Sequence, residues 1–213
     1  MYIPPHFHET NLDRIAALVE AYSFATLVTT RDGLPDANHI PFFLAPDQGP
    51  QGTLYGHLAR ANPQAAFAPG EKALAIFTGP HAYVSPSWYA APGVPTWNFA
   101  VAHAWGTVEV LDDPARQAWI VNTLTERYDP PVAEPDGPAM PAEAQARMLP
   151  GIVAFALRVE RWQAKFKLSQ NRTAADRQGV IAHLGQDEHP EAQALAGLML
   201  EDLARDALRP PKA

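Results

Sequence analysis

The sequence contains no cysteine among its 213 residues. This absence excludes disulfide bonds, thiol nucleophiles and thiolate metal sites. Any chemistry therefore depends on histidine, carboxylate, lysine or arginine side chains, or on a bound cofactor. The chain also has no uninterrupted apolar run approaching about 18 residues, and its start, MYIPPHFHE, has no basic region leading into an apolar run. We therefore expect a cytoplasmic protein without a membrane segment.

Positive charge is also in short supply. The formal net charge is −7, with 16 Lys and Arg against 23 Asp and Glu. Non-specific nucleic-acid binding needs a basic surface that neutralises phosphates, so this balance disfavours it without excluding a local basic patch. Proline, in contrast, is abundant: 22 residues is roughly double the average usage of about 5%. A chain rich in turns and short, bounded strands is expected.

Apolar and β-branched residues fall into six runs with strand character. These runs are 24–30, 36–44, 53–57, 73–79, 96–111 and 152–168. The first two flank Asp32-Gly33, a hairpin turn signal. We expect helices at 11–22, 61–67 and 113–127, a loop or weak helix over 130–150, and a helical tail over 173–208 that breaks near Gly185 and restarts at His189-Pro190. The pattern predicts a mainly β (α+β) fold, a closed antiparallel barrel of about six strands with peripheral helices.

The stretch VPTWNFAVAHAWG at 94–106 has an unusual alternation for a strand. One face carries the bulky residues Trp97, Phe99, Val101, His103 and Trp105. The other face carries Asn98, Ala100, Ala102, Ala104 and Gly106 and is nearly bare. The small face leaves room either for a flat ligand or for close packing of another strand or subunit, and the sequence leaves both interpretations open.

The stretch RWQAKFKLSQNR at 161–172 concentrates positive charge. Read as a strand, one face carries Arg161, Gln163, Lys165, Lys167 and Ser169. The chain has only four lysines, and two of them lie here. This face suits an anionic partner such as a phosphate or an electron-rich ring edge. A solvated sheet edge on which lysine blunts strand pairing explains the pattern equally well.

Other candidate residues give weaker signals. Arg60 precedes the expected helix start at Asn62-Pro63, where an arginine and free amides make a reasonable phosphate site. The eight histidines form no metal-ligand spacing, and strand histidines such as His39, His57, His81 and His103 are more typical of hydrogen-bonded side chains. Ser85 and Ser87 lack the GxSxG elbow of a hydrolase nucleophile. No catalytic constellation is visible, so enzyme activity stays open.

Six blocks of the chain, taken in order, resemble the PaiB-type family of FMN-binding negative transcriptional regulators. They are MYIPPHF, NHIPFFL, GHLARANPQ, FTGPHAYVSPSWY, VPTWNFAVAHAWG and KFKLSQNRTAADRQGVI. The resemblance implies a split β-barrel related to pyridoxamine-phosphate oxidases and flavin reductases, with FMN as the cofactor. It also implies a homodimer with flavin sites near the subunit interface. The expected domains are an FMN-binding barrel over 1–172 and a helical extension over 173–213, packed on the barrel or the dimer partner.

The resemblance also implies a set of cofactor-binding residues. Arg60, with the amides near His57 and Ala59, would bind the FMN phosphate. The remaining residues would border the ring or ribityl chain, or would reach the ring edge or phosphate, in some cases from the partner chain. They are His39, Pro41, Tyr83, Ser85, Trp97, Asn98, Lys167, Gln170 and Asn171. Phe99 stands where the family block has tyrosine, so any role of that hydroxyl is absent.

Three functions follow from these expectations. The first is a negative transcriptional regulator that acts on DNA directly or through a regulatory protein. The only stretch that could form a DNA-reading helix is NRTAADRQGVIAHL, and the tail at 188–208 is acidic. The second is a small FMN-dependent oxidoreductase or flavin reductase without DNA contact. The third is a split barrel that binds haem or another planar cofactor through one of its histidines.

Overall fold

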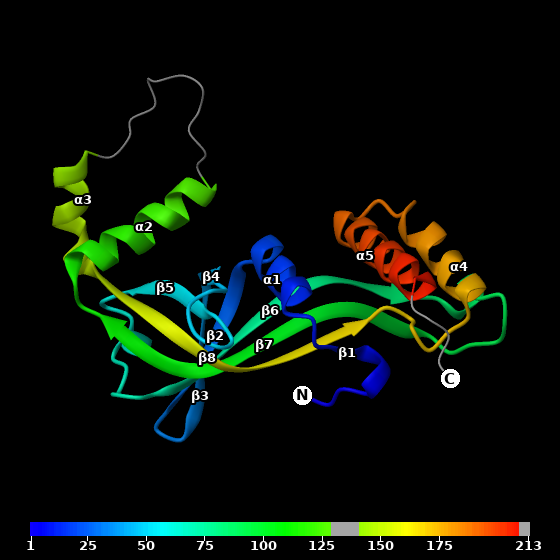
Figure 1. Cartoon of the computed structure of the whole chain (residues 1–213), viewed down its shortest axis with the longest axis horizontal. Coiled ribbons are helices and arrows are strands. Elements are labelled where there is room, and N and C mark those ends of the chain that lie inside the picture. The colour runs from blue at the N-terminus through cyan, green and yellow to red at the C-terminus, as the bar shows by residue number, and fades with distance from the viewer. Residues whose placement is uncertain (129–140, 209–213) are drawn as a thin grey trace. The chain divides into compact units, whose positions relative to one another are not determined.

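The computed structural model describes residues 1–128 and 141–208 (Figure 1). Its strands are β1 (His8–Glu9), β2 (Phe24–Arg31), β3 (Leu34–Pro41), β4 (Phe43–Ala45), β5 (Thr53–Ala59), β6 (Lys72–Val84), β7 (Thr96–Leu111) and β8 (Ile152–Lys167). Its helices are α1 (Leu12–Ala21), α2 (Pro114–Tyr128), α3 (Ala142–Met148), α4 (Ala174–Leu184) and α5 (Pro190–Ala207). Four 3-10 turns complete the order: η1 (Pro5–Phe7), η2 (Pro63–Ala65), η3 (Pro86–Trp88) and η4 (Leu149–Gly151).

The helix ends follow the capping signals of the sequence. The side chain of Asn11 accepts a hydrogen bond from the amide of Arg14, which caps α1. Thr173 caps α4 in the same way through the amide of Asp176, and α5 begins with Pro190 at its first position. The expected helices at 11–22, 113–127 and 173–208 are therefore confirmed, including the break near Gly185. Of the span 130–150, residues 130–140 lie outside the described residues, and α3 occupies part of the remainder.

The predicted hairpin is confirmed as β2 and β3. Asp32 and Gly33 both have positive φ, at 51° and 77°, as a two-residue hairpin turn of the primed type requires. The register pairs Arg31 with Leu34 and continues to Phe24 opposite Pro41. One predicted run, 36–44, divides into β3 and β4: the amide of Phe42 still bonds the carbonyl of Ser23 beside β2, whereas the residues from Phe43 pair with β5.

The strands form one antiparallel sheet with the order β3-β2-β6-β7-β8-β5-β4, and β1 pairs with β8. The two ends of this order, β3 and β4, are not paired with each other within the described residues, so the sheet is open. The predicted fold class is confirmed, but closure of the barrel is wrong. The described residues hold eight strands rather than six, because the run 36–44 divides into β3 and β4 and because β1, with only two residues, leaves no periodic signal.

The chain divides into two compact units. The terminal unit comprises Met1–Leu18, Thr78–Ala102 and the described part of Gln163–Ala213. The central unit comprises Val19–Phe77 and the described part of His103–Trp162. Strands β6, β7 and β8 each contribute residues to both units. None of the described helices has both the length and the apolar character needed to cross a bilayer.

Each unit has its own buried residues. In the central unit, one cluster packs beneath α2, with Phe43 stacked on Tyr55 and the Trp119 ring meeting both edge-on. Its buried members are Phe43, Tyr55, Leu111, Ile120, Leu124, Ala154 and Ala156. In the terminal unit, α4 and α5 pack on each other and bury the apolar residues Val180, Leu184, Leu195 and Met199.

Candidate functional site

The alternation along β7 is confirmed, and its small face is buried. Every small-face residue from Asn98 to Gly106 is buried, whereas the bulky residues between them are partly or largely exposed. In the central unit, a Cβ atom placed on Gly106 would overlap the carbonyl of Arg158 on β8. In the terminal unit, the Asn98 side chain on the same face donates to the Ser169 Oγ and the Met199 Sδ. Protein therefore packs against this face, which supports the close-packing interpretation over a ligand slot.

The cationic face of β8 lies beside the bulky face of β7. In the central unit, the Arg161 guanidinium lies 5.5 Å from the centre of the Trp105 ring. In the terminal unit, the Lys165 ammonium lies 5.4 Å from the centre of the Phe99 ring. Arg161 and Lys165 therefore lie on the aromatic side of β7, whereas the Lys167 ammonium contacts the Asn98 side chain of the small face.

The structure divides the twelve predicted site residues between the two units. The central unit holds His39, Pro41, His57, Ala59 and Arg60. The terminal unit holds Tyr83, Ser85, Trp97, Asn98, Lys167, Gln170 and Asn171. Each group is described by itself below.

Arg60 lies at the exposed end of β5 and contacts the start of β8. Its Nε donates to the carbonyl of Pro150 at 2.6 Å, and its Nη2 donates to the carbonyl of Ile152 at 2.8 Å. These bonds leave Nη1 for another acceptor. The expected helix at 61–67 is wrong: only the three-residue turn η2 forms, and the side chain of Asn62 caps its Gln64 amide. A single turn has no helix dipole that could attract a phosphate. The predicted phosphate site therefore depends on the Arg60 side chain alone.

The two predicted histidines of the central unit differ in environment. His39 is exposed on β3, and its Nδ1 lies 3.0 Å from the hydroxyl oxygen of Thr26. His57 on β5 is half-buried, and its buried Nδ1 has no hydrogen-bond partner among the residues that the structure describes. Burial lowers the pKa of His57 below its usual value of 6.5. The ring is therefore neutral near pH 7. Pro41 and Ala59 are the last residues of β3 and β5.

Gln64, which the sequence analysis did not select, organises the turn that follows Arg60. Its side chain is buried, and its Nε2 lies within hydrogen-bond distance of the Leu27 carbonyl, the Thr29 hydroxyl and the Asp36 carbonyl. Its Oε1 accepts from Asn38 at 3.0 Å. A buried amide with all its groups paired ties the β2–β3 hairpin to the turn. A glutamine in the block ARANPQ gives no such signal, because its partners are distant in sequence.

Lys167 is the most constrained of the terminal-unit candidates. Its ammonium donates to the Thr96 hydroxyl at 2.7 Å, to the Trp97 carbonyl at 2.5 Å and to the Asn98 Oδ1 at 3.4 Å. These three acceptors match the three donors of an ammonium group. Burial lowers the pKa of Lys167 below 10.5, and the charge of Lys165 lowers it further. A flavin contact to Lys167 would have to replace or share one of these bonds.

Two exposed rings lie near the start of β7. Trp97 is 55% exposed and Tyr83 is 46% exposed, and their ring centres are 6.2 Å apart in an edge-to-face arrangement. His81 completes the group with its ring centre 6.4 Å from that of Trp97. Ser85 is turned to its own loop, where its hydroxyl caps η3 and lies 2.8 Å from the Ser87 hydroxyl. The exposed rings offer a surface to a planar ligand, whereas Ser85 has a local structural role.

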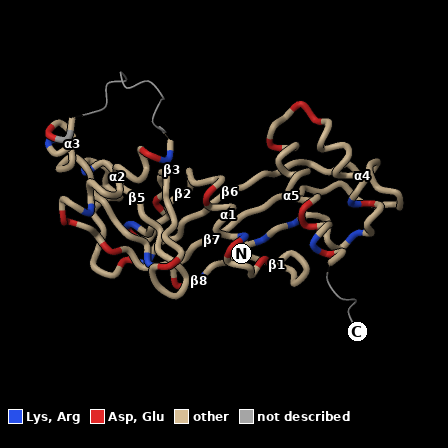
Figure 2. The backbone as a smooth tube through the Cα atoms, turned by 45° about the horizontal axis from the view of Figure 1, so that its top comes forward, with Lys and Arg blue, Asp and Glu red and all other residues tan. Residues whose placement is uncertain are grey.

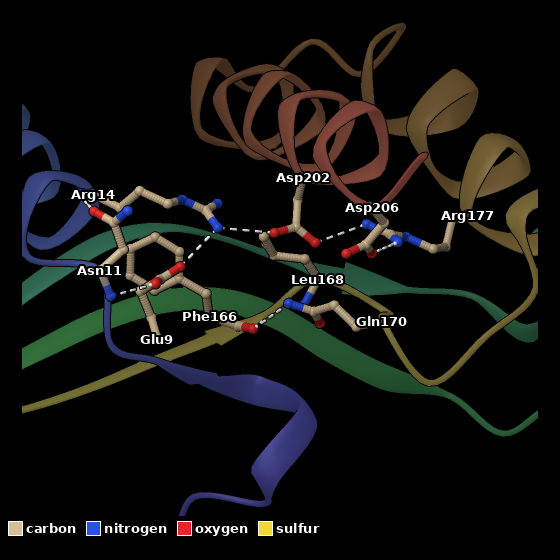
Figure 3. A network of polar contacts seen from close by, with 9 residues as sticks. All are labelled: Glu9, Asn11, Arg14, Phe166, Leu168, Gln170, Arg177, Asp202 and Asp206. Carbon is tan, nitrogen blue, oxygen red and sulfur yellow. Dashed lines mark hydrogen bonds and ion pairs between the residues drawn. The ribbon is translucent and has the colours of Figure 1, made fainter. Parts of the chain in front are cut away.

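Gln170 supports the turn after β8, as Figure 3 shows. Its Nε2 donates to the Phe166 carbonyl and its Oε1 accepts from the Leu168 amide, both at 2.7 Å. Both ends of the amide are thus used by the backbone. Asn171 is exposed in the same turn. The structure therefore brings Trp97, Asn98 and Lys167 together and gives Gln170 a structural role.

An ion-pair network holds α5 in place within the terminal unit (Figure 3). Asp202 on α5 accepts from Arg14 of α1 and from Arg177 of α4, both at 2.9 Å. Arg14 also pairs with Glu9, and Arg177 also pairs with Asp206, both at 2.7 Å. Asp202 and Arg177 are buried, so α5 is fixed through paired charges that water does not screen.

Comparisons with known proteins place the chain in a family. The model of the family described as "Putative FMN-binding domain" matches residues 1–161. The chain belongs to this family. It is 39% identical to the protease synthase and sporulation protein PAI 2 of Bacillus subtilis, over 96% of this chain and 99% of that one. An uncharacterized protein of Emericella nidulans is 31% identical over 72% of this chain and 78% of that relative. The predicted PaiB-type membership is confirmed, and FMN is the cofactor of the family.

Solved structures support the fold. The FAD and heme binding protein of Mycobacterium smegmatis superposes with a TM-score of 0.59 at 24% identity, over 80% of this chain and 78% of that one. The flavocytochrome Anf3 of Azotobacter vinelandii superposes with a TM-score of 0.61 at 14% identity, over 81% of this chain and 73% of that one. At these identities the likeness concerns the fold alone.

The residues present fit the chemistry of FMN, which combines an anionic phosphate with a planar ring that has a polar edge. In the central unit, Arg60 has an exposed guanidinium with Nη1 outside its two bonds, and His57 has a buried nitrogen with no partner within residues 1–128 and 141–208. In the terminal unit, the exposed rings of Trp97 and Tyr83 suit a planar ligand, and Lys167 supplies positive charge. Each group thus has the donors or surfaces that one part of the cofactor needs.

Proposed function

We propose that this FMN-binding chain is a cytoplasmic, homodimeric regulator of the PaiB type, which lowers transcription through a regulatory protein rather than by contacting DNA with its C-terminal helices. The name of the Bacillus relative, which refers to protease synthesis and sporulation, supports a regulatory role. The residue roles implied by the resemblance, the homodimer and the division of the chain at residue 172 belong to this proposal.

The charge of α4 and α5 is the observation that carries the proposal. Residues 173–208 contain seven carboxylates and two arginines (Figure 2). One of these arginines, Arg177, is buried in ion pairs with Asp202 and Asp206, so Arg205 is the remaining one. DNA-reading helices place several cations against phosphates. An acidic helix pair would repel the DNA backbone.

Binding of promoter DNA, measured by fluorescence anisotropy with and without FMN, tests this proposal. A specific promoter fragment and a scrambled fragment are titrated at low and at physiological salt. We expect weak binding at low salt that is lost at physiological salt and does not distinguish the two fragments. Tight binding that prefers the promoter fragment at physiological salt would overturn the proposal in favour of a direct repressor.

A small FMN-dependent oxidoreductase is the second candidate, and the exposed rings favour it. Bound FMN accepts and returns electrons. Trp97 and Tyr83 present exposed aromatic rings, and the Lys167 ammonium bonds the Trp97 carbonyl. Oxidation of a nicotinamide cofactor, followed at 340 nm with FMN present, separates this function from a purely regulatory one. The sequence also left open a barrel that binds haem through one of its histidines, and an absorption spectrum of the protein titrated with haem tests that function.

A further inference from the structure

Ser169 has a backbone conformation that needs an explanation. Its φ is +61°, in the left-handed region, where a residue with a side chain is strained. It is buried and lies just after β8, outside the residues 1–161 that the family model matches. Glycine would adopt this conformation without the penalty. A serine here therefore indicates a task for its hydroxyl.

The Ser169 hydroxyl fixes one end of a buried amide. The Nδ2 of Asn98, which is fully buried, donates to the Ser169 Oγ at 2.8 Å and to the Met199 Sδ at 3.5 Å. With both N–H groups directed to these acceptors, the Oδ1 of Asn98 faces the Lys167 ammonium at 3.4 Å. A flipped amide would place its N–H groups against the ammonium. Ser169 and Met199 thus select the orientation that gives Lys167 its third acceptor.

We propose that Ser169 is a positioning residue for Lys167. Ser169 acts through the Asn98 amide, and Met199 of α5 is the second residue that holds this amide in its orientation. Met199 lies one turn before Asp202 on the same buried face of α5, and Asp202 is held by Arg14 and Arg177. The C-terminal helices therefore act on the Lys167 ammonium through Met199 and the Asn98 amide. The consequence for flavin binding rests on the proposed placement of Lys167 beside FMN.

Two substitutions separate the hydroxyl from the backbone strain. Ser169→Ala removes Oγ and keeps the strain, whereas Ser169→Gly removes Oγ and relieves it. The Lys167 ammonium is titrated by NMR of the lysine side chains without flavin, and Lys167→Arg assigns its signal among the four lysines. We expect the pKa of Lys167 to fall below the parent value in both variants, because the ammonium loses an acceptor while Lys165 still repels it. Ser87→Ala, a serine of the same unit, is the matched control and should leave the titration unchanged.

Met199→Leu tests the second anchor at nearly constant volume. Combined with Ser169→Ala, it should lower the pKa of Lys167 more than either substitution alone. An unchanged titration in both Ser169 variants would overturn the inference. A change in the Lys167 titration that appears only in Ser169→Gly would also overturn the inference, because the backbone strain rather than the hydroxyl would then be responsible.

Flavin binding shows whether this positioning serves the cofactor. We expect both Ser169 variants to bind FMN about three- to tenfold more weakly, the loss of roughly one net hydrogen bond. If Lys167→Ala leaves FMN affinity unchanged, the proposed placement of Lys167 beside FMN fails, and the NMR titration still decides the role of Ser169. The two failures are thus distinguishable.

Discussion

Gly106 of β7 lies directly against the carbonyl of Arg158 on β8, with no room for a Cβ atom between them. This contact belongs to the packing that fills the small face of β7. We predict that Gly106→Ala lowers the free energy of unfolding by about 1–3 kcal/mol, because the two strands would have to separate. Gly197→Ala is the matched control, since a Cβ atom on Gly197 meets open space within α5. It should stabilise the protein by about 0.5–1 kcal/mol. Urea denaturation of both variants measures this, and equal effects would contradict the packing account.

Asp202 is the shared carboxylate of the network in the terminal unit. Asp202→Asn removes one charge while Arg14 and Arg177 keep Glu9 and Asp206 as partners. We predict a loss of about 3 kcal/mol, at the low end of the range for breaking a buried ion pair. Asp206→Asn, at a position a third exposed, should cost clearly less. A smaller loss for Asp202→Asn than for Asp206→Asn would show that the network does not anchor α5.

Asp176 provides a pH-dependent contact between α4 and the loop that follows η3. Its carboxylate accepts from the amides of Ala90 and Ala91. Burial alone would raise the pKa of Asp176, but the Ala91 and Ala90 amides, Thr173 and the Arg172 charge lower it overall. A lowered pKa means that the stabilisation is present above the unfolded value of 3.8 and is lost as the pH falls below it. Asp176→Asn should therefore be less stable than the parent at neutral pH, and thermal unfolding should show this difference shrinking below pH 3.8.

His57 should make the protein less stable in mild acid. Burial lowers the pKa of His57 below 6.5, so the unfolded chain takes up this proton at a higher pH than the folded chain. Stability is therefore fully present above pH 6.5 and declines as the pH falls from there to the folded pKa. His57→Gln should reduce the loss of unfolding free energy between about pH 7.5 and 5.5.

His103 has a pKa lowered by burial as well, and its Nδ1 is also buried without a partner in the described part of the chain. The double variant with His57→Gln and His103→Gln should accordingly show a weaker pH dependence than either single variant. An unchanged dependence in all three variants would rule out both histidines as its source.

Local patterns made most of the elements predictable. Asp32-Gly33 indicates its hairpin because the turn needs two residues that tolerate positive φ, and Pro190 marks a helix start because its missing N–H costs nothing there. Strand β7 could be assigned at 96–111 from the alternation alone. Strand β1 could not be assigned, since two residues carry no period, and the division of the run 36–44 into β3 and β4 could not be seen. Closure of the sheet depends on pairings that no local pattern encodes.

The candidate site was less predictable than the fold. Lys167 stands out in the sequence because lysine is rare, but only the structure shows that its ammonium already has three acceptors. Gln64 and Ser169 were missed because their partners come from distant segments, and the left-handed φ of Ser169 has no sequence signal. The contact between the Lys165 ammonium and the Phe99 ring could not be predicted either, because it depends on how β7 and β8 are paired.

Recognition of the FMN phosphate by Arg60 is the part of the proposed function on which the flavin site depends most. Quenching of flavin fluorescence on titration with protein tests this directly, with riboflavin as the ligand that lacks the phosphate. We predict tight binding of FMN, much weaker binding of riboflavin, and a loss of about 1–3 kcal/mol in FMN affinity for Arg60→Ala with little change for riboflavin. Equal affinity for the two flavins, or no binding of either, would contradict the account.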